Sequence, residues 1–378
     1  MLGDDPAQTV RYHRFLLGGT RTRLESYRQA IRQEVKPGDV VLDLGSGTGI
    51  LALLASRAGA RKVYAIEMGE VAEVARLLCS ENGAEDRVVV IHDRSTHVEL
   101  PEPADVLVFD IFETFGLQPG GFSAIIDARE RLLKGDGILI PCSVDLIAAP
   151  AEVPILYQRE IDFWNGRLLG VDLSPVRAFA VNNHYPVSLD PTAVLGAPAV
   201  LGHIRLSDLG DPHLKSSVST RATRSGIVHG VCLWFRAELA PGVTVTNEPS
   251  ATTTNYAQAL FPLVQPIPLE SGDTVSISVQ TFDAAEWRWQ IGVNGSPQAI
   301  QSTLWGFPLS KSRLLARASD RAPTLSRSGE AKLLLLSRMN GKHTIAQLET
   351  EISQRFPKSF RTRREISAFV REVVDRCT

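Results

Sequence analysis

The first third of the chain alternates short apolar runs with longer stretches in which apolar residues recur every three or four positions. The short runs predict buried strands, and the longer amphipathic stretches predict helices. Such alternation is typical of an α/β domain with a mostly parallel sheet covered by helices. Strands are expected at Val40–Leu44, Lys62–Glu67, Val88–His92, Asp105–Asp110 and Ile138–Pro141, and helices at Thr22–Val35, Ile50–Ala58, Val71–Asn82 and Phe122–Leu133.

After about residue 150 the pattern changes to short runs rich in β-branched residues, separated by Pro, Gly, Asn and Thr. This pattern predicts an antiparallel sheet or barrel. In the last run Trp287 and Trp289 alternate on one face, which favours core packing over an aromatic wall for a ligand. The clearest runs are Val228–Leu239, Val243–Asn247, Val275–Phe282 and Trp287–Val293.

Helical periodicity returns near residue 328, in Glu330–Arg338, Thr344–Arg355 and Arg363–Arg376. Thr344 is a suitable N-cap for the second of these segments. The polar stretch Arg317–Leu325 before them is interpreted as a linker or short strands. The chain is therefore divided into an N-terminal helical segment at 1–35, a Rossmann-like domain at 36–145, a β-barrel domain at 146–313 and a small helical module at 314–378.

The composition fits two or three ordinary globular domains, with 378 residues, 44% hydrophobic and 22% charged. A net charge of −2 predicts no strong field for polyanions and disfavours nucleic acid as a partner. Cys79, Cys142, Cys232 and Cys377 are scattered, which predicts no metal site and fits a reduced, cytoplasmic protein. The polar N-terminus does not match a signal peptide, and no apolar run is long enough to span a membrane.

A glycine turn joins the first strand to its helix, in the order Gly45-Ser-Gly47-Thr-Gly49. Glycines let the backbone turn sharply and let a ligand lie against it. Asp43 lies at the end of the first strand, and Glu67 ends the second strand, where an acid can accept hydrogen bonds from ribose hydroxyls. The spacing G-x-G-x-G differs from that of dinucleotide sites. Together these features resemble class I S-adenosylmethionine (SAM) methyltransferases, although another doubly wound domain could also carry a glycine turn.

This resemblance implies SAM as the cofactor and assigns its contacts along the strand ends. The turn would hold the methionine part, Glu67 would hold the ribose, and Asp43 would also belong to the cofactor site. Three residues after the third strand would lie near the adenine. The turn is Gly45, Gly47 and Gly49, and the three adenine residues are Asp93, Arg94 and Ser95.

Two carboxylates, Asp110 and Glu113, follow the fourth strand closely. A guanidinium group suits such a pair, because carboxylates can bind its fork of N–H donors bidentately. A capping acid followed by a solvated loop acid is an equally good interpretation of this segment alone.

Other segments resemble the protein arginine methyltransferase family over residues 12–310. The helix Arg23-Leu-Glu-Ser-Tyr27-Arg-Gln-Ala-Ile31 is similar to a family helix whose arginine meets the SAM carboxylate. Phe163-Trp164-Asn165 with the later Gly-Val-Asp-Leu-Ser stretch, and His229-Gly230, also resemble family segments. Thr254-Asn255-Tyr256 lies where the family has T-H-W, a loop that closes the guanidinium pocket.

The chain departs from the family pattern on the acceptor side. Asp110 stands for the first of two glutamates, and the second position falls on Pro119, so Glu113 is the candidate second carboxylate. Asn255 replaces the histidine, and Tyr256 replaces the tryptophan but keeps an aromatic wall. These changes suggest an altered acceptor.

The resemblance implies an enzyme that methylates a guanidinium nitrogen of arginine, in free L-arginine or a small guanidine of specialised metabolism. The alternatives are arginine in a protein or ribosomal peptide, and a non-catalytic scaffold that binds SAM. A homodimer is also implied, with an arm around Val176–Pro191. The last 50 residues resemble small winged-helix domains that bind leader peptides, which implies docking of a peptide or protein. A packing appendage is an equal alternative for these residues.

Overall fold

The computed structural model describes residues 6–18, 21–251, 256–316, 318–375 and 377. The chain divides into two compact units, Met1–Pro308 and Leu309–Thr378, and each is treated separately. Across the described residues, every helix is too short or too polar to cross a membrane.

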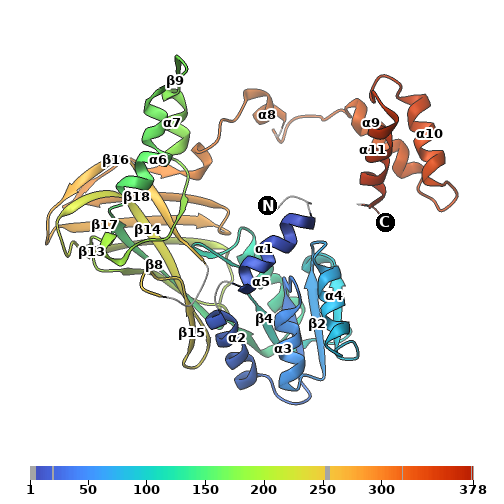
Figure 1. Ribbon diagram of the computed structural model, residues 1–378, viewed down its shortest axis with the longest axis horizontal. Coiled ribbons are helices and arrows are strands. Elements are labelled where there is room, and N and C mark those ends of the chain that lie inside the picture. The colour runs from blue at the N-terminus through green and yellow to red at the C-terminus, as the bar shows by residue number, and fades with distance from the viewer. Residues whose placement is uncertain (1–5, 19–20, 252–255, 317, 376, 378) are drawn as a thin grey trace. The chain divides into compact units, whose positions relative to one another are not determined.

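A five-stranded parallel sheet lies at the centre of the N-terminal half of the first unit (Figure 1). Its order is β3-β2-β1-β4-β7, so the chain reverses direction across the sheet between β1 and β4. Ligands in such sheets bind at the carboxyl ends of the strands beside this reversal. The strands are β1 (Val40–Leu44), β2 (Lys62–Glu67), β3 (Val88–His92), β4 (Ala104–Phe109) and β7 (Leu133–Ile140).

The predicted alternation of strand and helix is confirmed, and β1, β2 and β3 have the predicted bounds. β4 lies one residue earlier than the predicted Asp105–Asp110. β7 begins five residues before the predicted start, because its first half is an exposed edge strand with polar residues. The associated helices are α1 (Pro6–Gly18), α2 (Arg21–Glu34), α3 (Ile50–Ala58), α4 (Ala72–Glu81) and α5 (Gly121–Arg131).

Antiparallel sheets form the β-barrel domain that follows. One has the order β11-β16-β14-β8-β12 with β15 beside β14, and the other has the order β13-β17-β18-β19 with β20 beside β18. Trp287 and Trp289 are buried in the core, as predicted. The strands are β8 (Ser143–Ala151), β11 (Tyr185–Val187), β12 (Ala199–Arg205), β13 (His213–Arg221), β14 (Gly226–Ala240), β15 (Val243–Thr246), β16 (Gln258–Leu269), β17 (Thr274–Phe282), β18 (Glu286–Val293), β19 (Ser296–Pro297) and β20 (Gln301–Ser302).

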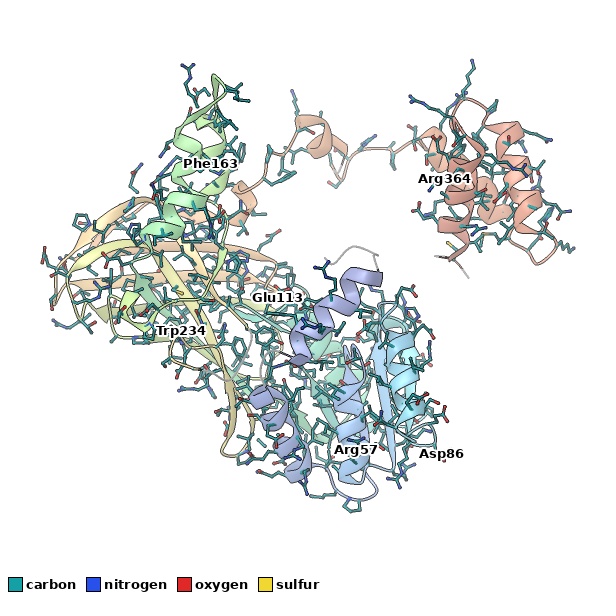
Figure 2. The ribbon with its side chains drawn as sticks, in the orientation of Figure 1. Arg57, Asp86, Glu113, Phe163, Trp234 and Arg364 are labelled. Carbon is teal, nitrogen blue, oxygen red and sulfur yellow. The ribbon has the colours of Figure 1, made fainter. Side chains whose placement is uncertain are left out.

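Between β8 and β11 the chain leaves the barrel in a short helical excursion, which Figure 1 shows projecting from the sheets. It contains α6 (Pro154–Glu160), the short β9 (Arg167–Leu168) and β10 (Val171–Asp172), and α7 (Ser174–Ala180). We call residues 154–180 the arm. Its exposed apolar side chains are Ile155, Phe163 (labelled in Figure 2), Leu168, Leu169 and Val171.

The second unit is helical throughout its regular structure. Thr344 caps α10, since its hydroxyl accepts the Gln347 N–H and the Gln347 side chain accepts the Thr344 N–H at 2.8 Å, which confirms the predicted N-cap. Residues 318–326 are neither helix nor strand. No strand occurs in this unit among the residues that are described. Its helices are α8 (Lys311–Ala316), α9 (Arg327–Arg338), α10 (Ile345–Arg355) and α11 (Arg363–Asp375).

Candidate functional site

A pocket of about 570 Å³ lies at the carboxyl ends of the parallel strands. This volume suits a cofactor or a small-molecule ligand. Asp43, Gly49 and Glu113 do not line it, and Asn255 lies outside the described residues. The other predicted site residues all line it: Arg23, Gly45, Gly47, Glu67, Asp93, Arg94, Ser95, Asp110 and Tyr256.

The glycine turn after β1 forms one wall. Gly47 has φ +53°, and a Cβ atom there would lie 2.6 Å from the ring of His13, so a larger residue would fit neither the backbone nor the space. The Glu67 carboxylate accepts the N–H groups of Gly47 at 2.8 Å and Gly69 at 2.7 Å. The acid at the end of β2 therefore also holds the turn in place. Gly49, at the start of α3, packs against Ala75 outside the pocket.

Two buried oxygens beside this turn lack partners. Asp43 accepts the Ala52 N–H at 2.9 Å through Oδ2, whereas Asp43 Oδ1 and Ser46 Oγ have no hydrogen-bond partner among the described residues. Burial raises the pKa of Asp43 to about 7. Buried polar atoms are normally hydrogen-bonded, so unpartnered ones beside a pocket are suited to a ligand that brings polar groups.

Asp93, Arg94 and Ser95 follow β3 and line the pocket on that side. The Asp93 carboxylate accepts the Arg94 N–H at 2.6 Å and lies 3.2 Å from His97 Nδ1. Its oxygens therefore shape this loop in addition to bordering the pocket.

Arg23 reaches the pocket because Tyr27, one turn later on α2, is anchored to the sheet. The Tyr27 hydroxyl donates to the Phe109 carbonyl at 2.8 Å, at the end of β4. Residues four apart lie on the same helix face, so Arg23 lies beside the next residue, Asp110. Arg23 forms an ion pair with Asp110 and donates to the Leu16 carbonyl at 2.7 Å. Only 3% of Arg23 is exposed, so this is a buried charge pair.

Tyr256 completes a cluster with these two residues. Its hydroxyl donates to Asp110 Oδ1 at 3.2 Å and lies 3.4 Å from Arg23 Nη1, while the guanidinium carbon of Arg23 lies 5.6 Å from the ring centroid. Burial raises the pKa of Tyr256 to about 12, so the phenol stays protonated. Tyr256 thus contributes a hydrogen-bonding hydroxyl in addition to the expected aromatic wall.

Glu113 lies apart from this cluster. It belongs to β5 (Phe112–Glu113), which pairs with β6 (Gly116–Leu117), and strand alternation buries Phe112 and turns Glu113 outward. Figure 2 shows it beside α1, and its charge is the second cause, after burial, of the raised pKa of Tyr12. Although Glu113 is exposed overall, partial desolvation of its carboxyl raises its own pKa. Of the two predicted acceptor carboxylates, only Asp110 lines the pocket.

Helix α1 supplies pocket residues that the sequence pattern did not identify. Tyr12 and His13 line the pocket with Leu16 and Leu17. Burial lowers the pKa of His13, so its neutral form is favoured. The one sequence feature that pointed to α1 was that His13 lies ten residues before Arg23. This spacing by itself matches no periodicity and no motif.

Known proteins resemble this chain in sequence and in structure. Residues 146–293 match the family model of the arginine methyltransferase oligomerization subdomain, and residues 20–139 match that of ribosomal protein L11 methyltransferase. An arginine N(omega)-methyltransferase of Streptomyces achromogenes subsp. streptozoticus is 32% identical over 283 residues, covering 72% of this chain and 76% of the relative. Protein arginine N-methyltransferase 6 of Xenopus laevis is 31% identical over 282 residues, covering 71% and 82%.

Among solved structures, the Trypanosoma brucei PRMT1 enzyme-prozyme heterotetrameric complex with AdoHcy has a chain that superposes with a TM-score of 0.72. The match covers 79% of this chain and 99% of that one, at 21% identity. This likeness shows a shared fold of a Rossmann-like domain followed by a β-barrel domain.

Proposed function

This chain belongs to the arginine methyltransferase family of SAM-dependent enzymes, and we propose that it methylates a guanidinium nitrogen of free L-arginine or of a small guanidine. The observation that carries this proposal is the Asp110 carboxylate, which lines the pocket at the end of β4 with Arg23 and Tyr256 around it. A carboxylate in this position can hold a cationic acceptor beside the cofactor.

The residues present fit SAM. Ser46, beside Gly47 in the turn, lines the pocket with a buried Oγ that has no partner among the described residues, which suits the polar methionine part of the cofactor. Arg23 would bind the SAM carboxylate, and Glu67 would accept hydrogen bonds from the ribose. Gly45 and Gly49 would complete the turn, and Asp93, Arg94 and Ser95 would border the adenine.

SAM supplies a methyl group on a sulfonium, so the protein needs little covalent chemistry. With SAM bound, the acceptor nitrogen would form a bond to the methyl carbon while the carbon–sulfur bond breaks and its electron pair stays on sulfur. Asp110 orients the guanidinium for this in-line attack and balances its charge. The nitrogen would then release a proton, which methylation has made acidic, to solvent. Tyr12 and Leu16 of α1 help to exclude water from the pocket.

The residues on the acceptor side of the pocket favour a small substrate. Asp110 is one methylene shorter than glutamate, and Glu113 does not line the pocket, whereas Gln118 and Pro119 do. Glu113 and Asn255 stay candidate acceptor contacts on the basis of the resemblance alone. The name of the Streptomyces relative, arginine N(omega)-methyltransferase, agrees with this choice.

The main alternative acceptor is arginine in a protein or ribosomal peptide. The name of the Xenopus relative favours it, as does the interpretation of the C-terminal helices as a winged-helix-like docking module. The assay that decides uses purified full-length protein, labelled SAM and either L-arginine or Arg-Gly-rich peptides. Label in L-arginine supports the proposal, label in peptides alone overturns the acceptor, and label in neither supports the non-catalytic scaffold.

We also propose that the protein is a cytoplasmic homodimer joined through the arm. The matched oligomerization subdomain includes these residues, and Phe163 and Leu169 expose 51% and 98% of their surface. The arm at 154–180 overlaps the start of the segment expected around Val176–Pro191. Light scattering tests the assembly: Phe163→Asp with Leu169→Asp should convert a dimer into a monomer, and an unchanged mass would exclude the arm. The buried free thiols of Cys79 and Cys232 agree with a reducing compartment.

A further inference from the structure

A hairpin turn of the β-barrel domain contacts the start of α5. The turn joins β17 to β18, and two of its residues, Asp283 and Ala284, have φ +50° and +53° although neither is glycine. Side chains disfavour this left-handed conformation, so it persists only where the surrounding structure fixes it. Here the Trp287 indole N–H donates to the Ala284 carbonyl at 3.0 Å, and the Asp283 N–H donates to the Pro212 carbonyl at 2.9 Å. These bonds fix the position of Asp283.

Asp283 caps α5, although it lies 160 positions after Ser123 of that helix in the sequence. The residue at the N-cap of α5 is Gly120, which has no side chain to accept the free N–H groups of the first turn. The Asp283 carboxylate accepts the Ser123 N–H at 3.1 Å and the Ser123 hydroxyl at 2.5 Å, and the Asp283 carbonyl accepts the Gly120 N–H at 2.9 Å. An N-cap side chain normally makes the first of these bonds, and a negative charge there also suits the helix dipole. A residue of the barrel domain thus completes a helix of the Rossmann-like domain.

The capped segment forms a wall of the pocket next to Asp110. At the start of this wall the Gln118 N–H donates to the carbonyl of Ile111, the residue after Asp110, at 2.9 Å. Asp283 holds the other end of the wall, at the first turn of α5. The wall is therefore attached once beside the acceptor carboxylate and once to the barrel. Its pocket-lining residues are Gln118, Pro119, Gly120, Gly121, Ser123 and Ala124.

We propose that Asp283 is a positioning residue for the methyl acceptor. Its carboxylate keeps the start of α5 in place, and the wall beside Asp110 then has the shape that the acceptor needs. Asp283 does not itself line the pocket, so it acts through this wall. The proposal rests on the proposed function, because that function assigns the wall to the acceptor.

A matched control lies at the other end of the same strand. Asp273 precedes β17 as Asp283 follows it. The Asp273 carboxylate also accepts one backbone N–H, from Glu270 at 2.8 Å, and one side-chain donor, the Asn294 amide at 2.8 Å. These partners belong to barrel turns, and neither lines the pocket. The same substitution at Asp273 therefore removes a similar pair of bonds without touching the wall.

Steady-state kinetics on the full-length protein test the consequence for the acceptor. Asp283→Gly removes the carboxylate and leaves a residue that readily adopts the left-handed backbone. KM for L-arginine should rise about tenfold, because the wall is misplaced, while calorimetric affinity for S-adenosylhomocysteine should be kept. Asp283→Asn should recover most of the loss, since asparagine keeps an oxygen for the Ser123 N–H and tolerates this backbone. Asp273→Gly should lower the unfolding temperature to a similar extent and keep the wild-type KM.

Hydrogen exchange of the free protein tests the cap without any reaction. The amides of residues 118–124 should exchange about tenfold faster in Asp283→Gly than in the wild type, and at the wild-type rate in Asp273→Gly. If only Arg-Gly-rich peptides are methylated, the kinetics are measured with them. A wild-type protein that methylates neither acceptor would refute the proposed function, and hydrogen exchange would still decide whether Asp283 holds the wall.

Unchanged exchange of residues 118–124 in Asp283→Gly would overturn the proposal. An unchanged KM despite faster exchange would overturn it as well, because the wall would then not position the acceptor. An equal rise of KM in Asp273→Gly would also count against it, since the effect would come from lost stability of the barrel.

Discussion

The substitution Asp110→Asn tests both the acceptor assignment and the buried charge cluster. Asparagine keeps the shape of the side chain and an oxygen that can accept from Tyr256, but it removes the charge paired with Arg23. In the free protein the guanidinium of Arg23 would then be buried without a counter-charge.

Three consequences are expected, and the first two have an approximate magnitude. Removing one partner of a buried ion pair costs about 3–5 kcal/mol of folding stability. Loss of the charged acceptor contact costs about 3 kcal/mol in the transition state, which is about a hundredfold in rate. Affinity for the cofactor should be kept or increased, because the SAM carboxylate would become the counter-charge for Arg23. The unfolding temperature of Asp110→Asn should therefore fall without ligand and recover toward the wild-type value when S-adenosylhomocysteine is saturating.

Three measurements check this reasoning: methyl transfer to L-arginine, calorimetric titration with S-adenosylhomocysteine, and thermal unfolding with and without it. Activity within threefold of wild type would refute Asp110 as the acceptor carboxylate. Loss of cofactor affinity by more than tenfold would refute the idea that Arg23 can exchange one carboxylate for another.

Other substitutions separate the parts of the site. Tyr256→Phe should keep cofactor affinity and lower kcat/KM for arginine about tenfold, because it removes the hydrogen bond to Asp110, worth about 1.5 kcal/mol. Unchanged kinetics would mean that Tyr256 contributes only its aromatic ring to the pocket. Gly47→Ala should weaken cofactor binding more than tenfold. The backbone φ of +53° disfavours alanine, and its Cβ atom would lie only 2.6 Å from the His13 ring. Gly83→Ala is its control, with φ +63° and open space, and should cost only about 1 kcal/mol of stability. Burial raises the pKa of Asp43 from 3.8 to about 7, so the folded state binds this proton more tightly than the unfolded state. That stabilisation is complete below about pH 4 and is lost as the pH rises through 7. Urea unfolding at a series of pH values should show that the free energy of unfolding declines with pH by up to roughly 4 kcal/mol less in Asp43→Asn than in the wild type. Parallel plots of unfolding free energy against pH for the two proteins would contradict this expectation.

The sequence predicted the elements of the sheet well because each buried strand is a short apolar run with a clear end. Val40–Leu44 is buried at every position, and its boundaries were predicted correctly. The start of β7 was missed because its exposed residues between Leu133 and Ile138 resemble a turn. The local pattern of hydrophobic residues reflects burial, so the sequence of an exposed edge strand gives little indication that a strand is present.

The site was predictable where a motif carries it and less so where the tertiary structure makes it. Gly47 and Glu67 were identified from spacing, and the structure joins them by a hydrogen bond. The position of Glu113 depends on which side chains of β5 face inward. The separation of three residues from Asp110 in the sequence does not reveal this. The ion pair of Asp110 with Arg23 joins residues 87 positions apart in sequence, and no local pattern reports it.

That ion pair changes how the two halves of the site are related. Arg23 was assigned to the cofactor and Asp110 to the acceptor, yet in the structure each is the other's counter-charge. If Arg23 binds the SAM carboxylate as proposed, that carboxylate would compete with Asp110 for the guanidinium, and Asp110 would gain capacity to hold a cationic acceptor. A cationic acceptor that reached Asp110 first would instead lie beside the positive charge of Arg23, with no cofactor carboxylate to offset it. Electrostatics therefore couples the sites with a positive sign, and by linkage each ligand should strengthen binding of the other by the same factor.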